Sequence, residues 1–246
     1  MKRSTWESLR ELREIVAPAG AMYRDAHYLV ADMRVDATAA ARWVPRPLRV
    51  PPLARASLFT AWFPHSSFGS VYREAGLLLH VEHRGRPAVF SPWMLVDDDA
   101  ALILGREVLG YPKKLGDVRF ELAGDDVLGV AARRGTQLVH MEGTLGERVD
   151  KPPPMLGRPH RNVRGGPLSL PHIVAFTPRE VAREVRRAHL TVTVGTSERD
   201  PLADLGFGPV EAAYLHRVDL LPSFPPIPVG IPSPSWWLRQ LLLRTR

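Results

Sequence analysis

The chain contains 246 residues, of which 45% are hydrophobic and 24% charged, a composition typical of a globular protein with a full hydrophobic core. It has no cysteine, which excludes disulfides, cysteine zinc sites and thiol nucleophiles and fits a cytoplasmic location. The net charge of +7 comes from dispersed arginines without interleaved aromatic residues, and no apolar run approaches the roughly 20 residues of a membrane helix, so we expect neither a nucleic-acid nor a membrane partner.

The first half of the chain predicts alternating helices and strands. Hydrophobic spacing predicts an amphipathic helix over residues 4–16, and Asp36 is placed to cap a helix over residues 37–44. The acidic run over residues 97–99 is placed to cap a third helix over residues 99–109. Strand composition is found over residues 27–35, 53–63, 70–83 and 87–96.

The second half of the chain predicts strands and irregular segments. Residues 150–171 are rich in proline, glycine and arginine and predict a long surface loop. The proline-rich tail over residues 222–234 is expected to run extended over the surface before a short helix over residues 236–243. Further strands are predicted over residues 117–123, 127–133, 136–148, 172–177, 188–197 and 210–220.

Many short strands at close spacing indicate an α+β protein, mainly antiparallel, that forms a barrel or sandwich with a few peripheral helices. The chain shows no internal repeat and no composition break that would separate two domains. We therefore expect one domain over residues 1–246. Its core spans about residues 22–220, with the helix over 4–16 and the tail over 222–246 as appendages.

Only four of the 33 basic residues are lysines, and two of these, Lys113 and Lys114, are adjacent. Lysine differs from arginine because its amine can lose a proton and attack a carbonyl group. The pair could be two solvated amines on a surface turn. Its apolar neighbours favour a drier setting for one of them; they are Leu109, Tyr111, Pro112 and Leu115.

The segment over residues 105–115, which contains Gly-Arg-Glu and then Gly-Tyr-Pro-Lys-Lys-Leu, resembles the active-site segment of the acetoacetate decarboxylase family. The resemblance spans about residues 22–220 and implies a closed, cone-like β-barrel and a homo-oligomer. Trp236 and Trp237, expected to be exposed, are compatible with such an oligomer. Weaker matches in the same order lie over residues 28–36, 44–48, 72–76 and 201–205.

The resemblance implies a site for imine (Schiff-base) chemistry on a small oxo acid. Lys113 would be the nucleophile, Lys114 the cationic neighbour that tunes it, and Glu74 an acid/base group. Tyr111 would form part of the pocket wall. The lysine-derived iminium would itself accept electrons during bond cleavage, so no metal or organic cofactor is implied. His80 and His83 have metal-like spacing, but residues three apart on a strand face opposite ways, and we predict no metal site.

A lysine amine must be neutral to attack a carbonyl, although its ordinary pKa is about 10.4. Removal from water and repulsion by a second cation both favour the neutral form. If the segment after Pro112 is extended, Lys113 and Lys114 point to opposite faces. We therefore expect the burial of Lys113 to matter more than the charge of Lys114.

Two positions depart from the pattern of the family's decarboxylases. Ala26 falls where they carry an arginine thought to hold the substrate carboxylate, and Arg24, two residues away, could replace it on the same strand face. Thr60 falls where they carry a second buried glutamate. Three functions therefore stay open: decarboxylation of a 3-oxo acid, an imine-dependent aldolase-dehydratase reaction on an oxo acid such as pyruvate, and non-catalytic ligand binding.

Overall fold

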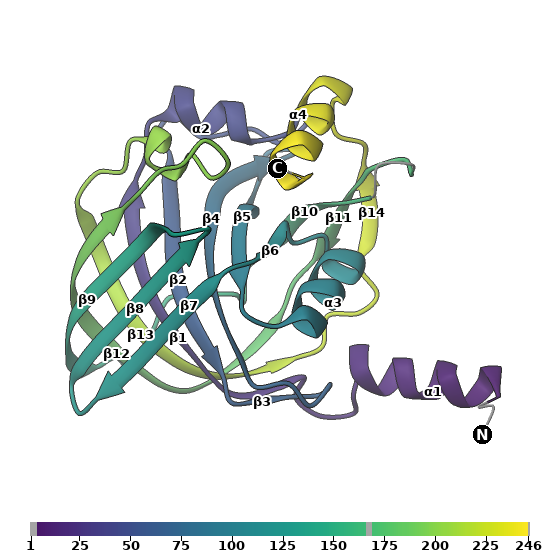
Figure 1. Cartoon of the computed structure of the whole chain (residues 1–246), viewed down its shortest axis with the longest axis horizontal. Helices are drawn as coiled ribbons and strands as arrows, with labels where there is room; N and C mark the ends of the chain where they lie inside the picture. The colour runs from purple at the N-terminus through teal and green to yellow at the C-terminus, as the bar shows by residue number, and fades with distance from the viewer. Residues whose placement is uncertain (1–3, 166–168, 246) are drawn as a thin grey trace.

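The computed structural model describes residues 4–165 and 169–245, in which helices surround a long, curved sheet (Figure 1). The helices are α1 (Thr5–Val16), α2 (Ala37–Trp43), α3 (Asp99–Leu109), α4 (Pro234–Thr245) and the 3-10 helix η1 (Leu202–Leu205). The strands are β1 (Tyr23–Arg34), β2 (Arg55–Phe63), β3 (His65–Ser66), β4 (Tyr72–His83), β5 (Arg86–Val96), β6 (Lys113–Leu115), β7 (Asp117–Ala123), β8 (Asp126–Arg133), β9 (Thr136–Arg148), β10 (His160–Arg164), β11 (His172–Phe176), β12 (Arg179–Val194), β13 (Val210–Leu221) and β14 (Ile227–Gly230).

Within the described ranges the strands form one sheet of mainly antiparallel pairs, in the order β14-β11-β10-β5-β4-β2-β1-β13-β12-β9-β8-β7. Strand β6 lies off this path and pairs in parallel with β5, and β10 also meets β5 in parallel. The expected α+β class with mainly antiparallel strands is confirmed. The helix caps form as predicted, because Asp36 accepts from the Ala39 amide and Asp98 from the Ala101 amide.

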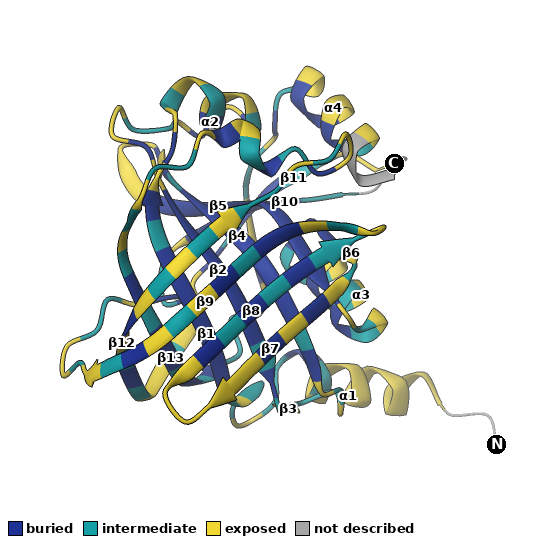
Figure 2. Ribbon diagram, turned by 60° about the vertical axis from the view of Figure 1, so that its left-hand side comes forward, coloured by how far each residue is buried: buried dark blue, intermediate teal, exposed yellow. Residues whose placement is uncertain are grey.

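The sheet curls but does not close by hydrogen bonds, so the expected closed barrel needs a correction. Among the described residues its pairing path begins at β14 and ends at β7. Strands β7 and β8 nevertheless fold back over β2 and β4, and β7 also contacts β5, which gives a cone-like shape (Figure 2). Side-chain packing across the curl, and not a continuous ladder, holds the two halves together.

Side chains alternate between two hydrophobic clusters on the opposite faces of the central strands. Along β1, Leu29 and Ala31 enter the cluster inside the curl, which also includes Phe120 of β7. Tyr28 and Val30 enter the cluster on the other face. Residues of α3 and β11, together with Met155 and Leu156, belong to this second cluster, which lies around the candidate site.

The segment over residues 150–171 is not only a surface loop. Its residues 160–164 form β10, which pairs with β11 and meets β5. His160 and Asn162 are fully buried there, and the Asn162 side chain bonds to the Ser91 amide and the Leu109 carbonyl. These long-range hydrogen bonds explain why local composition missed the strand.

Strand β12 begins nine residues before the predicted start at residue 188. Its first half carries charged side chains in place of an apolar alternation. Ion pairs to the neighbouring strands support it, for example Arg183 with Asp219 of β13 and Arg187 with Glu147 of β9. Cross-strand charge pairs of this kind stabilise a strand. They do not produce the alternating hydrophobic pattern from which a strand is predicted.

The C-terminal tail packs on its own chain. Residues 227–230 form β14 on the edge of the sheet, beside β11. Trp236 and Trp237 are buried, at 3% and 6% exposed, so the expectation that they are exposed is wrong. The Trp236 indole donates to the Trp43 carbonyl and packs edge-on against Phe90. The two tryptophans therefore give no support to the homo-oligomer, which stays a prediction.

Helix α1 projects from the body of the protein (Figures 1 and 2), and its Trp6 is 81% exposed. A capping box between Ser4 and Glu7 fixes its start. No helix in the described part of the chain has both the length and the apolar character that crossing a membrane requires.

Replacing Trp236 with alanine tests whether the tail is part of the core. We expect Trp236→Ala to lower the free energy of unfolding by about 3–5 kcal/mol, because it removes a buried aromatic side chain. Urea denaturation measures the change. Leu238→Ala on the same helix is the control, since Leu238 is 63% exposed and should cost little. Equal losses in the two variants would contradict the packing described here.

Candidate active site

Lys113 lies on β6, directly after a helix and a tight turn. Helix α3 ends at Gly110, whose left-handed φ of 68° lets the Tyr111 amide donate back to the Gly105 carbonyl. Pro112 then starts an extended segment, and Lys113 stands beside Met94 of β5 in parallel register. As a result the Lys113 side chain is only 5% exposed.

Gly105 makes room for the lysine stem. A Cβ atom at this position would lie 2.6 Å from Cε and 2.7 Å from Cδ of Lys113. A side chain at position 105 would therefore displace the lysine stem and its amine. The structure therefore explains why the first position of the Gly-Arg-Glu motif is a glycine, which the sequence pattern alone did not explain.

Glu74 of β4 faces the same cavity and meets the lysine. Its Oε2 accepts a hydrogen bond from Lys113 Nζ at 2.8 Å, and the Glu74 side chain is 7% exposed. The amine also lies 5.4 Å from the ring centroid of Tyr72. The two residues that the resemblance assigned to catalysis, 39 positions apart, are thus brought into one buried ion pair.

The pair faces a cavity of about 70 Å³. Tyr111 is part of its lining, where it was expected as part of the wall. Burial raises the pKa of the Tyr28, Tyr72 and Tyr111 hydroxyls well above the ordinary value, and the negative charge of Glu74 adds to the rise. These side chains therefore remain neutral phenols that can donate hydrogen bonds. Strand pairing places Ala61 directly opposite Glu74.

Lys114 points away from this cavity, as alternation along an extended strand requires. Its amine donates to Asp200 at 2.8 Å, and Arg133 donates to the other oxygen of the same carboxylate at 2.9 Å. The Trp93 indole completes the group with a bond of 3.1 Å to Asp200. Lys114 therefore anchors β6 to the segment before η1, and its charge is balanced there.

Burial alone would raise the pKa of the Asp200 carboxyl, but the hydrogen bonds and positive charges of Lys114 and Arg133 outweigh this effect. The pKa of Asp200 therefore lies below its ordinary value. The carboxylate is ionised throughout the neutral range and acts as a fixed counter-charge.

Arg24 is not brought to the cavity. Strand β1 has a bulge here. Tyr23 pairs with Leu220 and Ala26 pairs with Val218, so Arg24 and Asp25 together lie opposite one residue of β13. Asp25 takes a positive φ of 54° at this point. Tyr23 and Ala26 therefore share the cavity-side cluster, and the Arg24 side chain is exposed.

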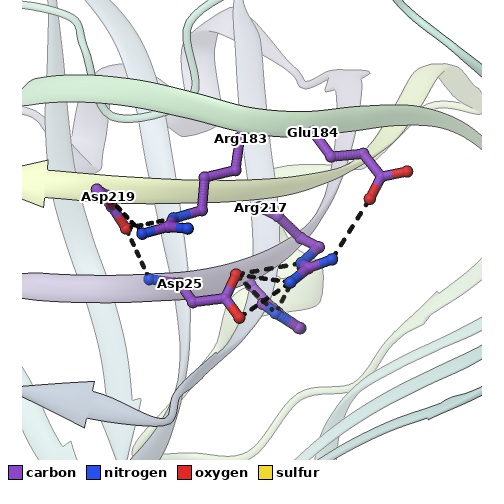
Figure 3. A network of polar contacts seen from close by, with 6 residues as sticks. Asp25, Arg183, Glu184, Arg217 and Asp219 are labelled. Carbon is purple, nitrogen blue, oxygen red and sulfur yellow. Dashed lines mark hydrogen bonds and ion pairs between the residues drawn. The ribbon is translucent and has the colours of Figure 1, made fainter.

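A network of ion pairs holds the bulge (Figure 3). The Asp25 amide donates to Asp219, which is also bound by Arg183. The Asp25 carboxylate accepts two bonds from Arg217, at 2.9 and 3.0 Å. The contacts of Asp25 join it to residues more than 190 positions away, so no local pattern around Arg24 indicated them.

The two departures noted in the sequence have different structural meanings. Ala26 is fully buried on the cavity side, where an arginine could have faced the site. Thr60 pairs with Ala75 and so lies on the opposite face from Glu74. Its neighbours Phe59 and Ala61 lie on the cavity side, and apolar groups therefore stand where a second carboxylate could approach Glu74.

Sequence reasoning missed several residues that shape the site. Tyr23, Tyr28 and Tyr72 line the cavity, and Asp200 binds Lys114. Alternation along the β1 and β4 segments could have indicated Tyr28 and Tyr72, which lie two residues from Ala26 and Glu74. Tyr23 reaches the cavity side through the bulge in β1. The partner of Lys114 had no local signal.

Across the described ranges, no group of three or more metal-binding side chains occurs.

A model of the acetoacetate decarboxylase family matches residues 11–225. The chain belongs to the acetoacetate decarboxylase family. Among curated relatives, the acetoacetate decarboxylase of Streptomyces nogalater is 37% identical over 114 residues, covering 46% of each chain. That of Ralstonia nicotianae is 30% identical over 112 residues, covering 46% of this chain and 45% of the relative. The matched stretch thus spans about half the length of these relatives.

Several solved structures share the fold of this chain. A structure of acetoacetate decarboxylase superimposes with a TM-score of 0.78 at 17% identity, over 87% of this chain and 90% of the other. The enduracididine biosynthesis enzyme MppR, complexed with pyruvate, gives a TM-score of 0.69 at 21% identity, over 80% of this chain and 85% of the other. At these identities the likeness establishes the fold alone.

Replacing Asp200 with asparagine tests the anchor beneath β6. At pH 7 we expect Asp200→Asn to lower the free energy of unfolding by about 3–5 kcal/mol, because two buried cations lose their counter-charge. The lowered pKa means that the carboxylate stabilises the fold above its unfolded pKa of about 3.9 and that this contribution disappears as the pH falls through the folded value. The gap between wild type and variant should therefore narrow below about pH 4.

Urea denaturation at pH 7 and at pH 3 measures this gap. Asp204→Asn, an exposed position four residues further on, is the matched control and should change stability little at either pH. A gap of the same size at both pH values would show that the charge of Asp200 is not what stabilises the segment.

Proposed function

We propose that this protein is a lyase that decarboxylates a 3-oxo acid through an imine on Lys113. The observation that carries the proposal is the Lys113–Glu74 pair, 2.8 Å apart and almost fully removed from water beside a cavity. Membership of the acetoacetate decarboxylase family supports the same chemistry. Lys113 is the nucleophile in this proposal, and Glu74 moves protons.

The first step needs a neutral amine. Transfer of one proton from the Lys113 ammonium to the Glu74 carboxylate converts two charges into two neutral groups, which a poorly solvated site tolerates better than water does. The amine then attacks the substrate carbonyl. Glu74 returns its proton to the carbinolamine oxygen, which leaves as water and gives the iminium.

The second step removes the carboxylate. The iminium nitrogen takes up the electron pair of the breaking carbon–carbon bond, carbon dioxide leaves, and a neutral enamine remains. Because a zwitterion is converted into neutral products, an apolar cavity favours this step more than water does. A proton from water then reaches the enamine carbon, and hydrolysis of the iminium releases the ketone and the amine.

The scarcity of charge in the described lining supports decarboxylation over the aldolase-dehydratase alternative. The solved structures of MppR include one with pyruvate and one with the condensation product of pyruvate and imidazole 4-carboxaldehyde. A 2-oxo acid in an aldol reaction keeps its carboxylate, which then needs a lasting partner. Lys113 is the one basic residue among the described residues that line this cavity, and a carboxylate that leaves needs no other.

A non-catalytic binding protein is a weaker explanation of the same geometry. A buried ion pair carries a desolvation penalty that apolar residues of similar size would avoid. Gly105 and the Lys114–Asp200 anchor also hold the amine in one place. Such positioning suits a reacting group.

Substitution of each lysine separates nucleophile from anchor. Lys113→Arg should abolish the covalent adduct that borohydride traps with acetoacetate, because a guanidinium cannot form the imine. Lys114→Gln should still be trapped on Lys113, since Lys114 lies on the other face of β6. Mass spectrometry of the intact protein and its peptides measures both. A folded Lys114→Gln variant without adduct, or an undiminished adduct in Lys113→Arg, would refute the assignment.

Substitution of Glu74 tests the acid/base role. Glu74→Gln should lower kcat for carbon dioxide release by about 100-fold or more, with a smaller change in KM, because proton transfer is lost while the cavity keeps its shape. Glu107→Gln is the control, since Glu107 is exposed and lies outside the cavity lining. An unchanged kcat in Glu74→Gln would remove Glu74 from the chemistry.

A further inference from the structure

Beyond the reacting pair, the described lining of the cavity offers a substrate neutral side chains only, of which the polar ones are four tyrosines and Ser223. Of the described residues that line it, Glu74 and Lys113 are the charged ones. Lys113 is consumed in the imine, and Glu74 has the same sign of charge as a substrate carboxylate. A carboxylate in this cavity therefore has the iminium itself as its counter-charge, and no positively charged side chain of the described lining remains to balance a second anionic group.

Aromatic rings fill the wall where a cation could have stood. Ala26 is fully buried in the hydrophobic cluster on this side of β1 and is not among the residues that line the cavity. Phe63 stacks on Tyr72 with ring centroids 4.5 Å apart, and Tyr23 packs against Phe63 at 4.9 Å. These aromatic contacts fill the wall, and the bulge in β1 leaves the Arg24 side chain exposed outside it.

The apolar lining continues from the amine to the surface. Met94 and Leu156 lie in the buried part of the lining. Phe224, on the tail after β13, belongs to the same lining and is 48% exposed. Further lining residues come from the segment before β1, from the residue before β12, and from the end of β13 and the tail after it. All but one are apolar; they are Val16, Met22, Pro178, Leu220, Leu221 and Ser223.

From these observations we propose that the site selects 3-oxo acids whose substituent on the carbonyl carbon is apolar and longer than methyl. The inference rests on the proposed imine chemistry and adds the substrate class. The carboxylate stays next to the iminium that it neutralises, and the substituent extends along the apolar lining toward Phe224. Binding energy comes from removing this substituent from water, because no basic side chain is left to supply it.

A panel of three substrates tests the proposal. Each methylene that becomes buried contributes about a fourfold gain, so kcat/KM should rise about 15-fold from acetoacetate to 3-oxohexanoate. The matched charged control is 3-oxohexanedioate, whose second carboxylate would enter the apolar lining. It should react more slowly than acetoacetate despite its longer chain. Carbon dioxide release, corrected for spontaneous decarboxylation, measures the rates.

Borohydride trapping on Lys113 with the neutral ketones acetone and 2-pentanone separates this inference from the proposed function. Adduct formation that favours 2-pentanone supports the apolar selection even if carbon dioxide is not released. Adducts with both ketones but no preference, or faster turnover of 3-oxohexanedioate, would overturn the selection and leave the imine chemistry standing. Failure of every compound to form an adduct would overturn the proposed function, and the substrate class with it.

A pair of variants on α3 tests whether the lining sets the preference. Val108 lines the cavity, whereas Ile103 on the same helix is outside the lining and 55% exposed. Val108→Lys should raise the kcat/KM ratio of 3-oxohexanedioate to 3-oxohexanoate at least tenfold. Ile103→Lys should leave that ratio within twofold of wild type. Equal ratios in both variants would show that the selectivity does not come from this wall.

Discussion

The buried contact between the Lys113 amine and the Glu74 carboxylate is the interaction on which the rest of the site depends. Two opposite charges are taken out of water, and the surrounding structure keeps them together. Gly105 leaves room for the lysine stem, and the turn at Gly110 directs the chain into β6. Asp200 fixes β6 from its other face, so the two adjacent lysines have different partners, and the proposed function gives the reaction to Lys113 and the anchoring to Lys114.

Much of the fold follows from local patterns in the sequence. Strand composition marks most of the strands, and acidic side chains mark the starts of α2 and α3. What local patterns could not give is the outcome of distant contacts. Whether the sheet closes depends on the curvature of all its strands together. Strand β10 depends on hydrogen bonds to β5 and α3. Trp236 is held in its buried position by a hydrogen bond to Trp43, which lies 193 positions away in the sequence.

The same division holds for the site. The opposite directions of Lys113 and Lys114 follow from the extended chain after Pro112, and the family motif indicated Glu74. The exclusion of Arg24 could not be predicted, since it depends on a bulge that distant ion pairs hold in place. The outcome also gives the loss of a family arginine a chemical meaning. The described lining holds no cation besides Lys113, so the Lys113–Glu74 pair lies among neutral, mostly apolar side chains, which suits the proposed loss of carbon dioxide from a zwitterion.

Exchange of ketone protons with heavy water tests the central claim most directly, because an enamine formed on Lys113 makes the protons beside the carbonyl exchangeable, and this exchange then requires Lys113. Proton NMR of 2-pentanone in deuterium oxide measures it. The account predicts enzyme-dependent exchange at the carbons on both sides of the carbonyl, and its loss in a folded Lys113→Arg variant. Exchange at the uncatalysed rate with the wild-type protein, or exchange that persists without Lys113, would contradict it.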